Sequence, residues 1–218
     1  MLLVGQYDSP YVRRVAVSLH WLGLPFRHNT LSVFKDAEAM RIFNPLGRVP
    51  SLVLVGGADR HQEVLIDSAA ILDHLDETVG PARALLPTAG AARRDALRTV
   101  AMATGAMDKA VSIVYERFLR PATARHQPWE DRCQGQLAEA LAYLEKQPLA
   151  KVLADGTTPQ AAITTACLIG FLKLRVPDSF PAGRYRALQQ LSTEAEGLPA
   201  FQSARPSATD TAPAAAKV

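Results

Sequence analysis

The fold is decided by the stretch Asn44-Pro45-Leu46-Gly47-Arg48-Val49-Pro50, which runs directly into the apolar residues 51–55. Asparagine, proline and glycine favour turns, and short runs rich in valine and leucine favour strands. Glycines at 56 and 57 then indicate a reversal into a second apolar run, residues 63–66. Asp67-Ser68 follows, with the residue types that begin helices. The pattern predicts a loop, a β-hairpin and a helix.

Upstream of this stretch, strand and helix patterns alternate. Residues 2–5 form an apolar run, and Ser9-Pro10 supplies a helix N-cap and a first-turn proline. The 3.6-residue period then continues to about Gly23, and residues 26–33 and 36–43 favour a second strand and a second helix. Because a strand–helix–strand unit gives parallel strands and a hairpin gives antiparallel ones, we expect a small mixed sheet.

The rest of the chain has helical periodicity only. Apolar residues follow one stripe over 91–118, and shorter stripes run over 129–144 and 163–174. We therefore predict an α/β domain over residues 1–80, a linker over 81–92, an all-helical domain over 93–202 and a flexible tail over 203–218. The tail is expected because it holds alanine, serine, threonine and proline with no large hydrophobic residue.

Composition excludes several classes of protein. The 218 residues are 48% hydrophobic and 21% charged, which is typical of a globular protein. Lysine and arginine number 24 against 21 acidic residues, and the basic residues do not cluster as nucleic-acid binding requires. No run of about 18 apolar residues indicates a membrane span, and the first residues lack the basic segment of a signal peptide. We expect a cytoplasmic protein without membrane or nucleic-acid partners.

Cysteines and histidines show no pattern of a metal or redox centre. Cys133 and Cys167 are far apart, and both lie on apolar helix faces, so we expect inert packing residues. The five histidines have no metal-ligand spacing, and no metal is expected. Nucleotide-binding and serine-hydrolase motifs are also absent from the sequence.

Together the loop at 44–50, the segment at 67–72 and the helical second half resemble the soluble glutathione transferases, in particular bacterial-like members with a serine-type site. The resemblance covers about residues 1–200. It implies a thioredoxin-like first domain with a βαβαββα order, an all-α second domain, and glutathione as co-substrate. It also implies a homodimer formed through the third and fourth helices, and a role in detoxification by conjugating or reducing a hydrophobic electrophile or peroxide. The alternative is a non-catalytic glutathione-binding or interaction protein with the same fold.

The resemblance assigns glutathione-binding roles to two segments. Val49-Pro50 corresponds to a cis-proline turn whose backbone pairs with the cysteinyl part of glutathione. Arg48 suits the glycyl carboxylate, although a solvated turn arginine explains it equally simply. Ser68 corresponds to the residue that binds the γ-glutamyl carboxylate, and Asp67, where the family more often has glutamate, to the partner of its ammonium group. Both are also ordinary helix-capping residues.

Ser9 corresponds to the catalytic serine of the serine-type classes, which hydrogen-bonds the glutathione sulfur. A hydrogen bond to a charged group contributes about 1.5–3 kcal/mol, enough to lower the thiol pKa by about one to two units. Tyr7 is the alternative, because other classes use a tyrosine at the end of the first strand. A cysteine at position 9 would indicate thiol–disulfide exchange, and this chain has none there.

The second-substrate pocket is the least specific prediction. We expect Tyr11 and several residues of the long helix to line it, namely Met102, Ala106, Met107, Ala110 and Tyr115. The family often begins a buried helix with a Ser/Thr cap and an aspartate near the end of its first turn. Here Thr158 is expected to cap with Pro159 at the first helical position, and Ala162 replaces the aspartate.

Overall fold

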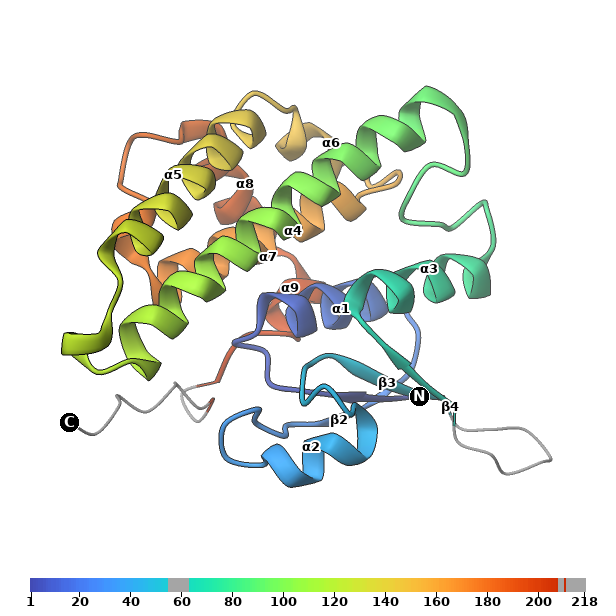
Figure 1. Cartoon of the computed structure of the whole chain (residues 1–218). Coiled ribbons are helices and arrows are strands. Elements are labelled where there is room, and N and C mark those ends of the chain that lie inside the picture. Colours follow the sequence, from blue (N-terminus) through green and yellow to red (C-terminus); the bar gives the residue numbers. More distant parts are fainter. Residues whose placement is uncertain (55–62, 208–209, 211–218) are drawn as a thin grey trace. The chain divides into compact units, whose positions relative to one another are not determined.

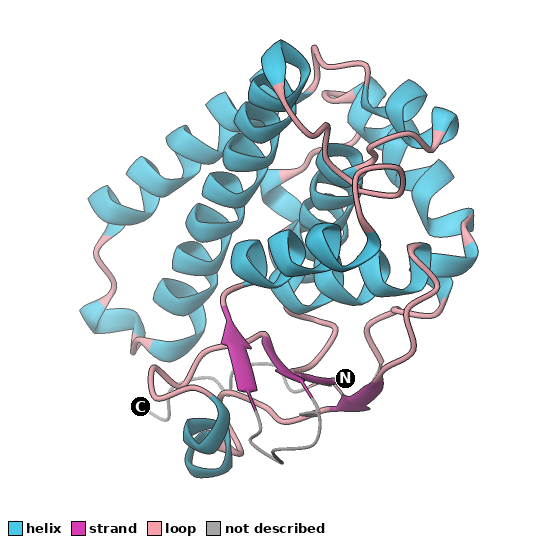
Figure 2. Ribbon diagram, turned by 90° about the vertical axis from the view of Figure 1, so that its right-hand side faces the viewer, coloured by secondary structure: helices cyan, strands magenta, loops and turns pink. Residues whose placement is uncertain are grey.

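The computed structural model describes residues 1–54, 63–207 and 210. Two compact units are formed, one by residues 1–88 with the described part of 197–211, and one by residues 89–196. The strands all belong to the first unit and the second unit is helical (Figure 2). This division confirms the predicted fold class, an α/β first domain followed by an all-α one.

The first unit contains a four-stranded mixed sheet. Its strands are β1 (Leu2–Val4), β2 (Arg27–Asn29), β3 (Ser51–Leu54) and β4 (Glu63–Ile66), in the order β2-β1-β3-β4. β1 and β2 are parallel and β3 and β4 antiparallel, as predicted, and β3 is also antiparallel to β1. β2 is shorter than the predicted strand 26–33, because this polar edge strand pairs with only three residues of β1. The predicted hairpin reversal lies outside the described residues.

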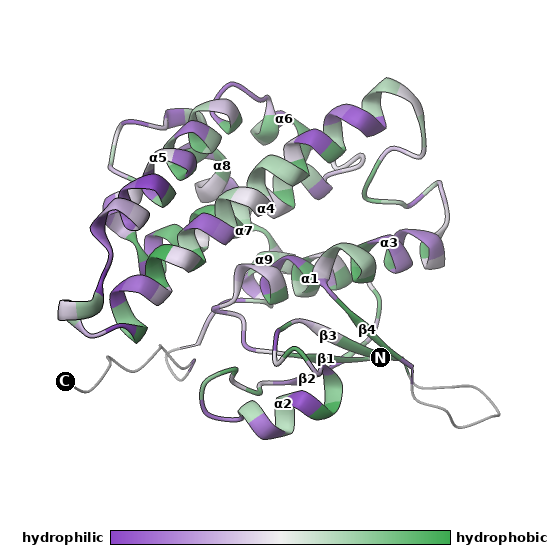
Figure 3. Cartoon of the chain, in the orientation of Figure 1, coloured by the Kyte–Doolittle hydropathy of each residue, from purple (hydrophilic) through white to green (hydrophobic). Residues whose placement is uncertain are grey.

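Helices cover both faces of this sheet. α1 (Pro10–Trp21) and α3 (Ser68–Val79) lie side by side on one face, and α2 (Ala37–Phe43) lies on the other (Figure 1). Val4 of β1, Met40 of α2 and Val53 of β3 form a buried cluster where α2 packs on the sheet. The two inner strands, β1 and β3, are mainly hydrophobic, whereas the edge strand β2 is polar (Figure 3).

The second unit consists of helices that begin earlier than predicted. Its longest helix, α4, spans Gly90–Leu119, so residues 90–92 are helical and do not belong to a linker over 81–92. α4 packs against both α5 and α7. The remaining helices of the unit are α5 (Gln127–Leu144), α6 (Leu149–Asp155), α7 (Gln160–Arg175) and α8 (Arg186–Gly197), with short 3₁₀ turns at Ala122–Ala124 and Pro177–Ser179.

α7 is buried over most of its length, and its start corrects one expectation. Thr158 does not cap the helix: its φ is +53°, and Pro159 occupies the N-cap position without a side-chain hydrogen bond. α7 begins at Gln160, so Thr158 lies one residue too early in the chain to be its N-cap. No helix within the described residues is both long and apolar enough to cross a membrane.

The C-terminal segment belongs to the first unit and not to the helical domain predicted for 93–202. α9 (Pro199–Gln202) packs against α1. Beyond it, in the region expected to be a flexible tail, Ala204 is fully buried, and its carbonyl accepts a hydrogen bond of 3.0 Å from Arg13 Nε. The guanidinium of Arg13 also lies over the ring of Phe201. Small residues can pack closely even where large hydrophobic residues are missing, as Ala204 does. Residues 208–209 and 211–218 of the predicted tail lie outside the described residues.

Candidate functional site

Strand register brings the three predicted glutathione-binding stretches to one edge of the sheet. Val4 of β1 is paired with Ser51 of β3, which is paired in turn with Ile66 of β4. These three residues therefore lie in line. At this edge β1 leads into the loop before α1, β3 is preceded by Val49-Pro50, and β4 continues into Asp67-Ser68. Segments that are far apart in sequence thus converge through the hydrogen bonds of the sheet.

Gly5 allows this close approach. Its φ is +128°, and a Cβ placed on it would lie 2.6 Å from Val12 Cγ2 and 2.9 Å from Val49 Cβ. Both separations are shorter than side chains tolerate, so only glycine fits between the first turn of α1 and the loop before β3. The Gly5 carbonyl also lies 2.7 Å from His28 Nε2. Gly5 was not predicted as a site residue, although a glycine directly after an apolar strand is a usable signal.

The loop before β3 is organised by Asn44, whose side chain is buried. Its Nδ2 donates to the Arg48 carbonyl at 2.9 Å, and its Oδ1 accepts from the Leu46 amide at 3.0 Å. This Asx turn holds the backbone that leads into Val49-Pro50. The Val49-Pro50 peptide bond is cis, as the resemblance implies. Pro50 is buried and Val49 half-buried, whereas the side chain of Arg48 is exposed.

Ser9 is the N-cap of α1, and its side chain makes only a weak hydrogen bond to the helix. Its Oγ accepts a hydrogen bond from the Val12 amide at 3.5 Å, which is the outer limit for such a bond. Pro10 follows at the first helical position, where its lack of an N–H removes one of the unpaired amides of the helix start. The Ser9 hydroxyl is half-buried and only weakly held by its own helix. It can therefore bind another group at low cost.

Asp67 is the N-cap of α3, and its side chain makes a short hydrogen bond to the helix. Its Oδ1 accepts from the Ala69 amide at 2.7 Å, and its backbone has φ +70° and ψ +133°. This conformation costs a residue other than glycine about 1–3 kcal/mol. Ser68, the first helical residue, is buried, and its Oγ accepts two hydrogen bonds from Arg14 of α1, at 3.0 Å from Nε and 2.8 Å from Nη2. Arg14 was missed because nothing in the sequence indicates that α1 is buried on its polar side.

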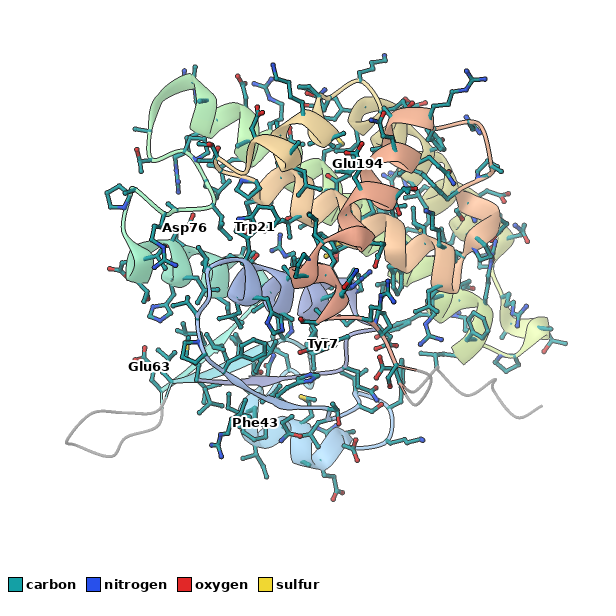
Figure 4. The ribbon with its side chains drawn as sticks, turned by 180° about the vertical axis from the view of Figure 1, so that it is seen from behind. Tyr7, Trp21, Phe43, Glu63, Asp76 and Glu194 are labelled. Carbon is teal, nitrogen blue, oxygen red and sulfur yellow. The ribbon has the colours of Figure 1, made fainter. Side chains whose placement is uncertain are left out.

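Tyr7, labelled in Figure 4, lies in the loop between β1 and α1. Its ring stacks on His28, with the ring centroids 4.0 Å apart and the planes 6° from parallel. Burial, with a smaller contribution from the Asp210 carboxylate, raises the pKa of Tyr7 to about 12. The phenol of Tyr7 therefore keeps its proton at neutral pH, and its ring is held against His28.

Comparison with known proteins shows to which family this chain belongs. The model described as "Glutathione S-transferase, N-terminal domain" matches residues 3–83. The GST-like protein YibF of Escherichia coli is 32% identical over 181 residues, which cover 80% of this chain and 83% of YibF. The chain belongs to the glutathione S-transferase family. Its first unit is accordingly the thioredoxin-like domain of that family, as the sequence predicts.

Solved glutathione S-transferases share the fold of the whole chain. A family member from Pseudomonas fluorescens with bound glutathione is 34% identical, covers 94% of this chain and 98% of its own, and has a TM-score of 0.81. A second structure from the same species holds S-(propanoic acid)-glutathione. It is 33% identical, covers 95% of this chain and 100% of its own, and has a TM-score of 0.77. Both relatives therefore bind glutathione or a thioether of it.

Residues predicted to line a second-substrate pocket differ widely in exposure. Ala106, Met107 and Ala110 are almost completely buried, as packing residues of a helical core are. Tyr115 is 43% exposed, and Met102 is half-buried, as is Tyr11 in the first unit. The three buried residues pack in the interior of the helical unit.

Neither cysteine of this glutathione S-transferase is accessible. Cys133 and Cys167 are both 0% exposed, and burial raises the pKa of the Cys133 thiol. A reactive cysteine is an exposed thiolate, so both have the properties of inert packing residues. No group of three or more potential metal ligands occurs among the described residues.

Proposed function

We propose that this member of the family is a glutathione transferase that binds glutathione and stabilises its thiolate. The observation that carries the proposal is the convergence of Ser9, Val49-Pro50 and Asp67-Ser68 at one sheet edge, with the Ser9 hydroxyl held loosely. The thiolate attacks an electrophilic carbon of a hydrophobic substrate, a C–S bond forms, and the leaving group departs with its electron pair. A relative that holds a glutathione thioether supports this product class.

Each segment has a separate task in the proposed reaction. The backbone of Val49 pairs with the cysteinyl part of glutathione, and Arg48 binds the glycyl carboxylate. Ser68 and Asp67 bind the γ-glutamyl group at the start of α3, where helix N-termini favour anions. The hydroxyl of Ser9 then donates to the sulfur and lowers the thiol pKa. The reducing side reaction, with a peroxide as electrophile, uses the same thiolate.

Binding and turnover must be measured separately, because a non-catalytic binder would share every residue except a functional Ser9. Retention on immobilised glutathione tests binding, and an aryl halide tests turnover. We expect the wild type to do both, and Ser9→Ala to bind glutathione but to turn over slowly. Absence of binding at millimolar glutathione contradicts the proposal, and binding without turnover by the wild type favours the non-catalytic alternative.

Two further properties are proposed from family membership. We expect a homodimer, which light scattering tests, and a monomer at micromolar concentration contradicts it. We also expect a cytoplasmic protein, which cell fractionation tests. Neither property enters the chemistry proposed for Ser9.

A further inference from the structure

A buried arginine of α1 meets the serine that begins α3. Arg14 is 1% exposed, and its Nε and Nη2 both donate to Ser68 Oγ, at 3.0 and 2.8 Å. Ser68 is itself 2% exposed. The two N–H groups of one guanidinium edge thus converge on a single hydroxyl oxygen, across the two helices that lie side by side in Figure 1. A paired contact of this kind fixes the position of the oxygen.

This contact determines which further hydrogen bonds the Ser68 hydroxyl can make. A guanidinium only donates, so the Oγ acts as acceptor toward Arg14 and its hydrogen must point elsewhere. Among the described residues, no protein group accepts that hydrogen. Ser68 also occupies the first position of α3, where a backbone N–H has no partner within its own helix. The residue therefore offers two donors to one external acceptor.

Charge strengthens the preference for an anion. The guanidinium lies one hydrogen bond behind the Ser68 oxygen and polarises the hydroxyl, and the partial positive charge of the helix N-terminus acts in the same direction. We infer that Arg14 is a positioning residue for the γ-glutamyl α-carboxylate of glutathione, acting through Ser68 without touching the ligand. The inference rests on the proposed function and adds to it the residue that sets the strength of this subsite.

Arg13 provides a matched control on the same helix. It is 3% exposed, nearly as buried as Arg14, yet it donates to the Ala204 carbonyl and lies over the Phe201 ring. These two partners belong to the C-terminal segment. Replacing Arg13 therefore removes an equally buried guanidinium without changing the contact to Ser68.

The test compares glutathione with γ-aminobutyryl-cysteinyl-glycine, an analogue that lacks only the α-carboxylate. Titration calorimetry on Arg14→Met is expected to show glutathione affinity lowered about 10-fold or more, because a charge-assisted arrangement is lost. Affinity for the analogue is expected to stay at the wild-type value. Arg13→Met is expected to leave both affinities unchanged. In turnover, KM for glutathione should rise in Arg14→Met while kcat at saturating glutathione stays unchanged.

Arg14→Lys replaces Arg14→Met in the experiment if the methionine variant does not fold. It keeps the charge but loses the paired donors, so we expect about a threefold loss for glutathione and none for the analogue. In a Ser68→Ala background the same change should have no effect on glutathione affinity. Equal losses for both ligands, or no loss for glutathione, overturn the role of Arg14. A wild type that binds neither ligand instead refutes the proposed function itself.

Discussion

The two helices that begin at the candidate site are capped in opposite ways. At α1 the Ser9 oxygen accepts its helix amide at 3.5 Å, whereas at α3 Asp67 accepts at 2.7 Å and a second residue, Ser68, is fixed by Arg14. The α3 end is therefore preorganised for a ligand group of fixed charge. The α1 end keeps a hydroxyl that can follow a reacting atom. In the proposed function, α3 accordingly recognises glutathione and α1 activates it.

The largest effect is expected from a side chain at Gly5, where the start of α1 and the loop before β3 approach each other closely. Gly5→Ala places a Cβ 2.6 Å from Val12 and 2.9 Å from Val49 in a backbone conformation with φ +128°. Overpacking and strain together should lower the free energy of unfolding by about 3 kcal/mol or more. Urea denaturation measures this loss. A fully stable Gly5→Ala variant would show that α1 and the loop before β3 do not need this close approach.

The next largest effect separates the two ends kinetically. Ser9→Ala should lower kcat about 10–100-fold near neutral pH, because the thiolate loses a hydrogen bond from a neutral donor, while KM for glutathione changes little. Ser68→Ala should do the reverse and raise KM while kcat is kept. Steady-state kinetics with an aryl halide compares them. If both variants lose kcat alone, the division of labour between α1 and α3 is wrong.

A smaller effect concerns stability at the same two positions. Asp67→Ala removes a 2.7 Å cap and should cost about 1 kcal/mol of unfolding free energy. Ser9→Ala removes a 3.5 Å contact and should cost only a few tenths of a kcal/mol, below the usual range for caps. Urea denaturation of the two variants side by side measures the difference. Equal losses would mean that Ser9 is an ordinary cap.

The smallest effect on activity is expected at Tyr7. Because its pKa is raised to about 12 and an unfolded tyrosine titrates near 10, the unfolded chain loses its proton first. The stability from this group is complete below about pH 10 and is lost as the pH rises toward 12. Tyr7→Phe should flatten that part of the stability profile and leave turnover near pH 7 within about twofold of wild type. A large loss of turnover would favour Tyr7 as the activating residue.

Sequence patterns predict the sheet and the segments that meet at its edge, because both depend on local signals. Turn residues at 44–50, the Ser9-Pro10 cap and the apolar run before Asp67 each specify their own element. The register of the sheet then brings them together without further information. The cis peptide at Val49-Pro50 followed from family resemblance and not from the residues alone.

What sequence patterns miss depends on tertiary contacts. Arg14 reads as a solvated residue of an amphipathic helix, yet α1 is covered by both α3 and α9, and the guanidinium is buried. Ala204 reads as part of a tail, yet Arg13 holds it. Met107 was expected to face a substrate and is a core residue instead. In each case the deciding partner is distant in sequence and leaves no periodic signal.

We propose that the loosely capped Ser9 hydroxyl lowers the thiol pKa of bound glutathione. Ultraviolet absorbance of the thiolate, followed against pH with glutathione saturating the protein, measures that pKa directly. We expect a wild-type pKa about one to two units below that of free glutathione, and a return toward the free value in Ser9→Ala. The same pKa in Ser9→Ala and in the wild type would contradict it.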